Sequence, residues 1–230
     1  MNTPNAQNIN RLYQEHEREF STFAALLKEY NQKFNLTSIT DEEEIKYKHF
    51  YDSLYGVEYI KENAYVAEIG SGGGFPSIPL KIARPDLKFT LIESTGKKCE
   101  FLKIAVRELG LKEVEILNAR AEDVAKEERY REQYDCCCAR AVARLNTLSE
   151  YCLPFVKIGG IFLAYKGDAA EELREAERAV CLLGGGKVQS VFYELPLSYG
   201  KRRLIFVDKE KKTSVLYPRG HGKERTKPLV

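Results

Sequence analysis

The sequence lacks the features that mark several protein classes. No apolar run reaches the ~18 residues of a membrane-spanning helix. The opening residues MNTPNAQNIN contain no basic stretch followed by an apolar one, as a secretory signal would. The six cysteines include no C-x-x-C pair, and none of the three histidines has a partner at ligand spacing. We therefore expect a cytoplasmic protein with no membrane association and no metal.

Three of the cysteines, Cys136, Cys137 and Cys138, are consecutive in a predicted strand. Neighbouring residues of a strand face opposite sides, so this triplet cannot converge on one metal ion. We expect buried thiols instead, because free cysteine fills protein cores as a small apolar side chain.

A net charge of +2 hides an asymmetry along the chain. Residues 198–230 contain ten Lys or Arg and three Asp or Glu, whereas the rest of the chain is net acidic. A basic tail on an acidic body is typical of a protein that meets an anionic partner at one edge. A tail that is only solvated has the same composition, so charge alone leaves both interpretations open.

Residues 1–63 predict a helical flank. Phe20, Phe23 and Leu27 follow the spacing of one buried helical face, which predicts a helix over Ile9–Phe34. Thr40 followed by Glu43 is typical of a capping box and predicts a second helix that contains His49 and Asp52. These two residues lie three apart on one face, and either a surface pair or a role toward the substrate fits that spacing.

Between residues 64 and 212 the pattern alternates between strand and helix. The predicted strands are Tyr65–Ile69, Lys88–Glu93, Val114–Asn118, Tyr134–Ala139 and Gly160–Tyr165, followed by Val188–Leu195 and Leu204–Val207. The predicted helices are Pro76–Ala83, Thr95–Leu109 with Gly110 at the C′ position, Glu122–Glu132, Arg144–Leu153 and Asp168–Leu183.

Strand followed by helix, repeated five times, predicts a parallel sheet with helices on both faces. No helix separates the last two strands, so they predict an antiparallel hairpin. The predicted fold is an α/β, doubly wound, Rossmann-like sheet of seven strands. No linker interrupts the chain, so we expect a single domain over 1–230, with a helical flank (1–63), a core (64–212) and a basic tail (213–230).

A glycine loop, VAEIGSGGGFPSIPL, follows the first predicted strand. Gly70 and Gly72 fit the nicotinamide fingerprint G-x-G-x-x-G, but its third glycine falls on Phe75, and Gly74 comes one residue too early. The missing side chains still allow a ligand to approach the backbone closely. With Phe75 and Pro76 next, the turn is less suited to presenting a helix N-terminus to a pyrophosphate. S-adenosylmethionine, which has no phosphates, is therefore favoured over a dinucleotide.

Acidic residues close successive strands of the predicted sheet. Glu68 ends the first strand, Glu93 ends the second, and Glu122 follows the third. A carboxylate at the end of the second strand is placed to accept both ribose hydroxyls of a nucleoside. Because the carboxyl ends of parallel strands meet at one edge, these groups predict a single crevice there, with adenine beyond the third strand.

Several segments together resemble the bacterial 16S ribosomal RNA methyltransferase G family, also called glucose-inhibited division protein B. They are EIGSGGGFPSIPLKIARP, TLIESTGKKCEFLK, NARAEDV, ARAVARL, GGIFLAYKG and YPRGHGKERTKPL, with FNLTSI and HFYDSL nearer the start. The resemblance covers nearly the whole chain. It implies a class I methyltransferase fold and N7 methylation of a guanine in small-subunit rRNA, with S-adenosylmethionine as donor.

The resemblance also implies cofactor contacts at Gly70, Phe75, Ala121, Glu122 and Arg140. Two positions depart from the family pattern. The loop more often begins with Asp where this chain has Glu68, and the strand before Arg140 is commonly rich in valine where this chain has cysteines.

Guanine N7 carries no proton, so the reaction needs no general base, and the sequence accordingly assigns no catalytic residue. The target base must be unpaired or extruded, since the deep major groove of an RNA helix hides N7. We expect 16S rRNA or the small ribosomal subunit as partner and a monomer as the active form. The candidate RNA contacts, for each of which a surface ion pair is the alternative, are Arg144, Lys166, Arg202, Arg203 and Arg219, together with Arg140.

Three other functions share parts of this pattern. A methyltransferase for a small metabolite uses the same glycine loop but gives the basic tail no role. A non-catalytic RNA-binding protein does not need the intact loop. A nicotinamide enzyme is disfavoured by Phe75.

Overall fold

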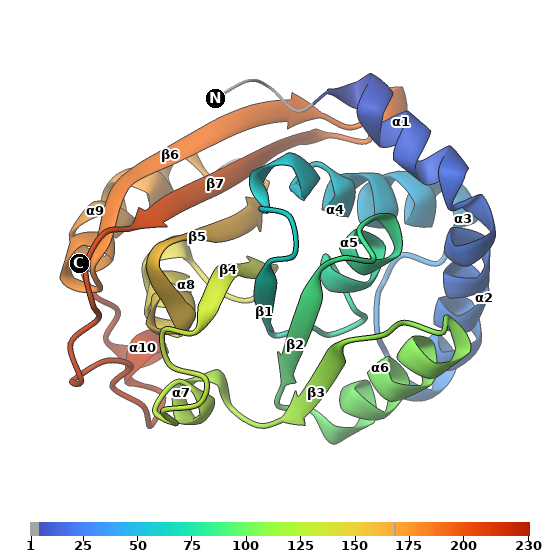
Figure 1. Cartoon of the computed structure of the whole chain (residues 1–230). Coiled ribbons are helices and arrows are strands. Elements are labelled where there is room, and N and C mark those ends of the chain that lie inside the picture. The colour runs from blue at the N-terminus through green and yellow to red at the C-terminus, as the bar shows by residue number, and fades with distance from the viewer. Residues whose placement is uncertain (1–4, 168) are drawn as a thin grey trace.

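A computed structural model describes residues 5–167 and 169–230. Its centre is a seven-stranded sheet in the order β3-β2-β1-β4-β5-β7-β6 (Figure 1). The strands are β1 Tyr65–Ile69, β2 Lys88–Glu93, β3 Val114–Asn118, β4 Tyr134–Arg140, β5 Val156–Lys166, β6 Gly185–Glu194 and β7 Lys201–Lys209. Strands β1 to β5 are mutually parallel, and β7 runs antiparallel between β5 and β6. The predicted mostly parallel sheet with its antiparallel C-terminal hairpin is confirmed.

Helices cover both faces of the sheet. The first face carries α1 Ala6–Glu15, α2 Glu17–Phe34, α3 Glu42–Glu44, η1 Ile45–Tyr51, α4 Asp52–Leu54, η2 Val57–Tyr59, α5 Ser77–Ala83 and α6 Gly96–Glu108. The second face carries α7 Ala121–Val124, α8 Leu145–Cys152, η3 Leu153–Phe155 and α9 Ala170–Leu182. A short turn, η4 Pro196–Ser198, joins β6 to β7, and α10 Lys223–Thr226 packs against α8.

Alternation of side chains along the strands creates two apolar cores. Cys136 and Cys138 of β4 face the first core, which also contains Phe20 and Phe23 of α2. Cys137, between them, faces the second core. All three thiols are free and buried, as the period of two along a strand requires. The N-terminal helices therefore share a core with the sheet.

Two details of the N-terminal flank differ from the sequence prediction. The single helix predicted over Ile9–Phe34 is divided at His16, whose φ of −124° and ψ of 26° are not helical. The break allows the Tyr13 ring to stack on that of Phe20 with centroids 4.9 Å apart. The second helix is capped by Asp41, not Thr40, because the Asp41 carboxylate accepts the amide hydrogen of Glu44 at 2.9 Å.

The helix predicted over Glu122–Glu132 is wrong. Only the short α7 forms, and the chain then continues through tight turns to Glu132, whose φ is 54°. Arg131 is turned inward, and its guanidinium donates to the carbonyl oxygens of Ala125 at 3.1 Å and Tyr217 at 2.9 Å. Tertiary hydrogen bonds thus override the local helical preference. Asp168, the predicted first residue of the last helix, lies outside the described residues.

Candidate active site

A cavity of about 320 Å³ opens at the carboxyl ends of β1, β2 and β3. This is the edge of the sheet at which the sequence predicted a crevice. Four predicted cofactor residues line it: Gly70, Glu93, Ala121 and Glu122. The other lining residues are Ile69, Ile92, Ser94, Thr95, Lys98, Ala119, Arg120, Ala141, Val142, Tyr151 and Arg225.

Glu93 ties two loops of this cavity together. Its Oε2 accepts the amide hydrogen of Gly72 at 3.0 Å, and its Oε1 accepts that of Thr95 at 2.7 Å. A carboxylate has about four acceptor sites, so Glu93 retains capacity for the hydroxyls of a ligand. Its position at the end of β2 suits a ribose diol.

Gly72 and Gly74 have different roles in the loop. Gly74 has a φ of +86°, and a Cβ there would lie 2.5 Å from Cγ1 of Ile78, so the residue is needed for packing. Gly72 has a φ of +54°, but a Cβ there would have only the Gly70 carbonyl oxygen within 4 Å, at 3.7 Å. Space beside Gly72 is therefore open to a ligand.

We expect the substitution Gly72→Val to abolish binding of S-adenosylmethionine. The valine side chain would fill the open space beside residue 72, and valine rarely adopts the positive φ of this position. Calorimetric titration measures the affinity, and circular dichroism measures retention of the fold. Gly110→Val is the matched control. Gly110 also has a positive φ, of +63°, with nothing within 4 Å of a Cβ, but it follows α6, whereas the Gly72 amide is bound by Glu93 of the cavity wall. Both variants carry a backbone strain of about 1–3 kcal/mol. Normal affinity in Gly72→Val would contradict the placement of the ligand.

Glu68 and Phe75, both predicted as cofactor contacts, lie beneath the glycine loop and not in the cavity wall. Oε1 of Glu68 accepts the amide hydrogen of Ser77 at 3.4 Å, and no solvent reaches its side chain. The Phe75 ring stacks on His49 with centroids 4.3 Å apart, and the Arg140 guanidinium lies 4.9 Å from its centroid. Both side chains therefore pack in the interior of the protein and do not face the cavity.

Burial raises the pKa of Glu68 to about 7, and Ser77 and Ser71 oppose that shift only in part. The pKa of Glu68 is higher in the folded than in the unfolded protein. Its contribution to stability is therefore fully present below pH 4.5 and is lost as the pH rises through about 7. We expect Glu68→Gln to raise the free energy of unfolding by roughly 3 kcal/mol more at pH 8 than at pH 4.5, at about 1.4 kcal/mol per pKa unit. Urea unfolding at both pH values measures this. Equal effects at both would show that Glu68 is ionised in the folded protein.

A second cavity, of about 290 Å³, adjoins the first at Ala141, which lines both. It lies between the N-terminal helices and the ends of β4 and β5. Its wall consists of Ile39, Lys48, His49, Asp52, Arg140, Ala141, Tyr165, Lys166, Gly167 and Arg202. Four of these side chains are cationic and one is anionic. Lys166 and Arg202, two predicted RNA contacts, are among them.

Arg140 and Asp52 form a buried ion pair at the centre of this wall. The Arg140 Nη1 lies 2.9 Å from Oδ2 of Asp52, and their side chains are 14% and 5% exposed. The same nitrogen donates to the carbonyl oxygen of Lys48 at 3.0 Å. Tyr193 donates its hydroxyl hydrogen to Oδ1 of Asp52 at 2.8 Å. Arg140 therefore lines the second cavity, whereas the sequence placed it with the cofactor.

His49 completes the network as a neutral ring. Burial, followed by the Arg140 charge, lowers the pKa of His49 to about 3. Nη2 of Arg140 lies 2.8 Å from Nδ1 of His49, and arginine can only donate, so Nδ1 accepts. The ring proton is then on Nε2 and is donated to Oγ1 of Thr37 at 2.9 Å. His49 has no free lone pair with which to act as a general base.

The remaining predicted RNA contacts do not reach either cavity. Arg144 is exposed and pairs with Glu175 at 2.6 Å. Arg203 donates to Ser190 at 2.8 Å and lies over the Phe192 ring. Arg219 is held by Glu150 at 2.7 Å. Lys166, within the second cavity, also pairs with Glu172 at 2.8 Å.

Sequence reasoning missed Tyr151 and Lys98 in the first cavity, and it placed Arg225 only within the basic tail. The missed residues come from helices α8 and α6, whose inward faces show no motif. The HFYDSL segment did carry a signal for the second cavity, because His49 and Asp52 were singled out by their spacing.

Comparisons with known proteins identify the family. The family model for rRNA small subunit methyltransferase G matches residues 16–198. The chain belongs to the rRNA small subunit methyltransferase G family. It is 46% identical over 215 residues to a Ribosomal RNA small subunit methyltransferase G from Alkaliphilus metalliredigens, covering 92% of this chain and 90% of that one. It is 48% identical over 217 residues to one from Staphylococcus epidermidis, covering 93% and 90%.

Solved structures extend the likeness at the level of the fold. A SAM-dependent O-methyltransferase from Thermotoga maritima has a TM-score of 0.54 at 14% identity, covering 82% of this chain and 73% of that one. TYW2 from M. jannaschii, solved in complex with AdoMet, also has a TM-score of 0.54 at 14% identity, covering 74% and 77%. This chain thus has the class I methyltransferase fold that its sequence predicts.

Residues 5–167 and 169–230 contain neither a membrane-spanning helix nor a metal-binding cluster. None of the helices in these ranges has the length and apolar character to cross a membrane. Within the same ranges, no group of three or more His, Cys, Asp or Glu side chains is placed to hold a metal ion.

Proposed function

We propose that this protein transfers a methyl group from S-adenosylmethionine to N7 of a guanine in 16S ribosomal RNA of the small subunit. The observation that carries this proposal is the junction of two cavities at Ala141, one with a nucleoside-binding wall and one with a cationic wall. Family membership supports the substrate class.

The residues of the first cavity fit S-adenosylmethionine. Gly70 offers bare backbone at the end of β1, Glu93 offers acceptor sites at the end of β2, and Ala121 with Glu122 follows β3. When bound, S-adenosylmethionine supplies an electrophilic methyl group on a sulfonium. These residues would hold the donor in one orientation in the cavity that adjoins the second cavity at Ala141.

The second cavity suits an extruded nucleotide. Lys48, Lys166 and Arg202 surround it with positive charge, which attracts a phosphate-bearing strand. Ala141 has a φ of 57° and presents only a methyl side chain at the junction, so the base and the donor are separated by little protein.

The chemistry of the wall favours N7 over a position that carries a proton. His49 accepts a hydrogen bond at Nδ1 and donates at Nε2, and Asp52 is paired with Arg140. Neither is free to remove a proton. Guanine N7 has a lone pair and no proton, so alignment of the reactants is sufficient.

Incubation of the purified protein with S-adenosylmethionine labelled in the methyl group and with small-subunit rRNA tests the proposal. We expect label in 7-methylguanosine, located by mass mapping of the digested RNA. Label only on a pyrimidine or on ribose would overturn it. Transfer to a small metabolite but not to RNA would favour the alternative of a metabolite methyltransferase.

The compartment and the oligomeric state belong to the same proposal. The six cysteines are free, which suits the reducing cytoplasm, where disulfides are rare. We infer that the protein works there as a monomer, as expected from the sequence. Light scattering with and without rRNA tests this.

A further inference from the structure

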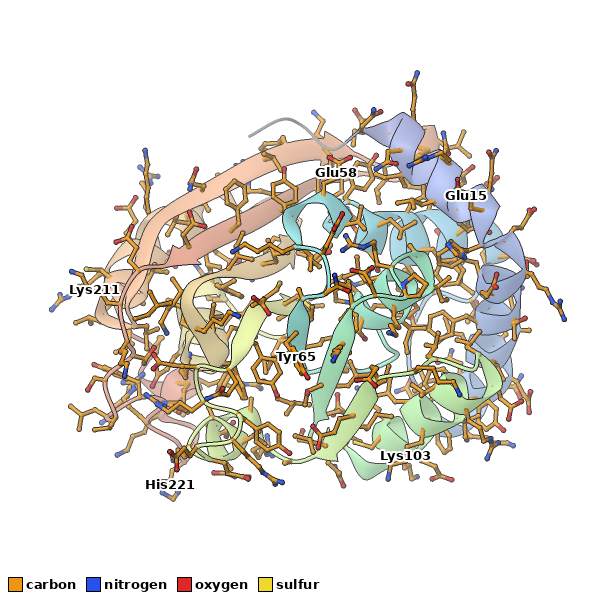
Figure 2. All side chains as sticks on the ribbon, in the orientation of Figure 1. Glu15, Glu58, Tyr65, Lys103, Lys211 and His221 are labelled. Carbon is orange, nitrogen blue, oxygen red and sulfur yellow. The ribbon has the colours of Figure 1, made fainter. Side chains whose placement is uncertain are left out.

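The C-terminal segment, residues 213–230, folds back onto the body of the protein. The segment includes α10, which packs against α8, and Figure 1 marks the C-terminus near α9 and the end of β7. His221 lies on its outer rim next to α7 (Figure 2). The sequence left open whether this basic tail is solvated or meets RNA, and in the structure its backbone is held at several points.

Buried polar groups anchor the segment to α8. Glu150, whose side chain is 0% exposed, accepts hydrogen bonds from the Arg219 guanidinium at 2.7 and 2.9 Å and from the Arg219 amide at 2.9 Å. Glu224 is fully buried, and its carboxylate accepts from the amide of Gly220. Thr147 of α8 donates its hydroxyl hydrogen to the carbonyl oxygen of Glu224 at 2.8 Å. The turn that precedes Arg225 is therefore fixed in place.

This anchoring puts Arg225 in the wall of the first cavity. There it joins Ala121, Glu122 and Tyr151. Burial raises the pKa of the Tyr151 hydroxyl, the nearby Glu122 charge adds to the rise, and Arg225 opposes it. Arg225 thus lies at the part of the cavity that follows β3, where the sequence places the adenine of the donor.

We propose that Arg225 is a further binding residue for S-adenosylmethionine and contacts its adenine ring. This inference rests on the proposed function. A guanidinium is planar, weakly hydrated and always charged, so it stacks on a purine or donates to the purine ring nitrogens without a change of protonation. The C-terminal segment is then a wall of the donor site, and its basic charge is only partly available to RNA.

Titration calorimetry without RNA tests this assignment. We expect Arg225→Ala to weaken S-adenosylmethionine binding about tenfold, the size of a partly desolvated cation–π contact. Lys223→Ala and Lys227→Ala are the matched controls, since both residues are exposed on the same segment and neither lines the cavity. We expect wild-type affinity in both. Arg225 is itself exposed, so its variant should unfold at the same temperature as the wild type in the absence of ligand.

A second probe locates the contact on the ligand. 5′-Methylthioadenosine retains the adenine and ribose but lacks the amino acid, so Arg225→Ala should weaken its binding by the same factor. Loss for S-adenosylmethionine alone would place Arg225 at the amino acid and overturn the adenine assignment.

The outcomes for the inference and for the proposed function differ. Wild-type affinity of Arg225→Ala for both ligands, with weakened binding of rRNA, would overturn the inference alone and assign the residue to the RNA. A wild-type protein that binds neither ligand would overturn the proposed function, and the inference with it.

Discussion

Replacement of Arg140 by alanine should lower the free energy of unfolding by about 3–5 kcal/mol, the usual result when one partner of a buried ion pair is removed. Asp52 has a side chain only 5% exposed and, among residues 5–167 and 169–230, keeps Arg202, 3.7 Å away, as its one cationic partner. His49 also loses the donor at Nδ1. Urea unfolding followed by circular dichroism measures the change. In methyl transfer, displacement of the second cavity's wall should lower kcat on the order of 10²-fold.

The double variant Arg140→Ala with Asp52→Asn separates the causes of these losses. Neutral asparagine removes the unpaired charge, so much of the lost stability should return while turnover stays low. Affinity for S-adenosylmethionine should change little in either variant, because Arg140 does not line the first cavity. Unchanged stability and turnover in Arg140→Ala would mean that the ion pair is dispensable and that the second cavity is not the substrate site.

The sheet could be predicted because its signals are local. Strands β1, β2 and β3 match their predicted bounds at both ends, since each is an apolar run flanked by turn residues. Gly110 was predicted to end α6, and its φ of +63° explains why glycine stands there. The glycine loop and the acidic strand ends located the first cavity through the general rule for parallel sheets.

The failures come from contacts between distant parts of the chain. Arg131 turns toward the carbonyl oxygen of Tyr217, 86 residues away, and the helix predicted around it does not form. The ion pair of Arg140 with Asp52, 88 residues earlier, also could not be predicted; the sequence named Arg140 only as a contact of the cofactor or of RNA. No local pattern carries such information, because the sequence around a charged residue does not show whether its partner is water, RNA or a buried carboxylate.

The basic tail shows the same limit at the level of a whole segment. Composition left a solvated tail and an RNA-binding tail open. The structure adds a third state, in which the buried Glu150 carboxylate holds Arg219 and the buried Glu224 carboxylate holds the backbone at Gly220. Glu150 lies in a predicted helix and Glu224 in the predicted basic tail, and the sequence marks neither of them as buried. Both carboxylates are buried because the C-terminal segment packs against α8.

Arg219→Ala should remove about 3–5 kcal/mol from the free energy of unfolding, because it leaves the Glu150 carboxylate buried and without its guanidinium partner. Arg144→Ala is the matched control. Its partner Glu175 is 45% exposed, and an exposed pair contributes about 0–1 kcal/mol. Urea unfolding of both variants at low and at high salt measures the difference. Added salt should weaken the contribution of Arg144 and leave that of Arg219 nearly unchanged, since buried pairs are screened little.

Loss of this anchor should also reach the donor site. When Arg219 no longer holds the C-terminal segment on α8, Arg225 leaves the wall of the first cavity, and S-adenosylmethionine binding should weaken at least as much as in Arg225→Ala. Adding Glu150→Gln to Arg219→Ala should restore much of the stability, because no charge is then buried unpaired, but it should not restore affinity for the donor. Recovery of both together would show that the segment docks without the Arg219–Glu150 pair and that its position does not depend on this contact.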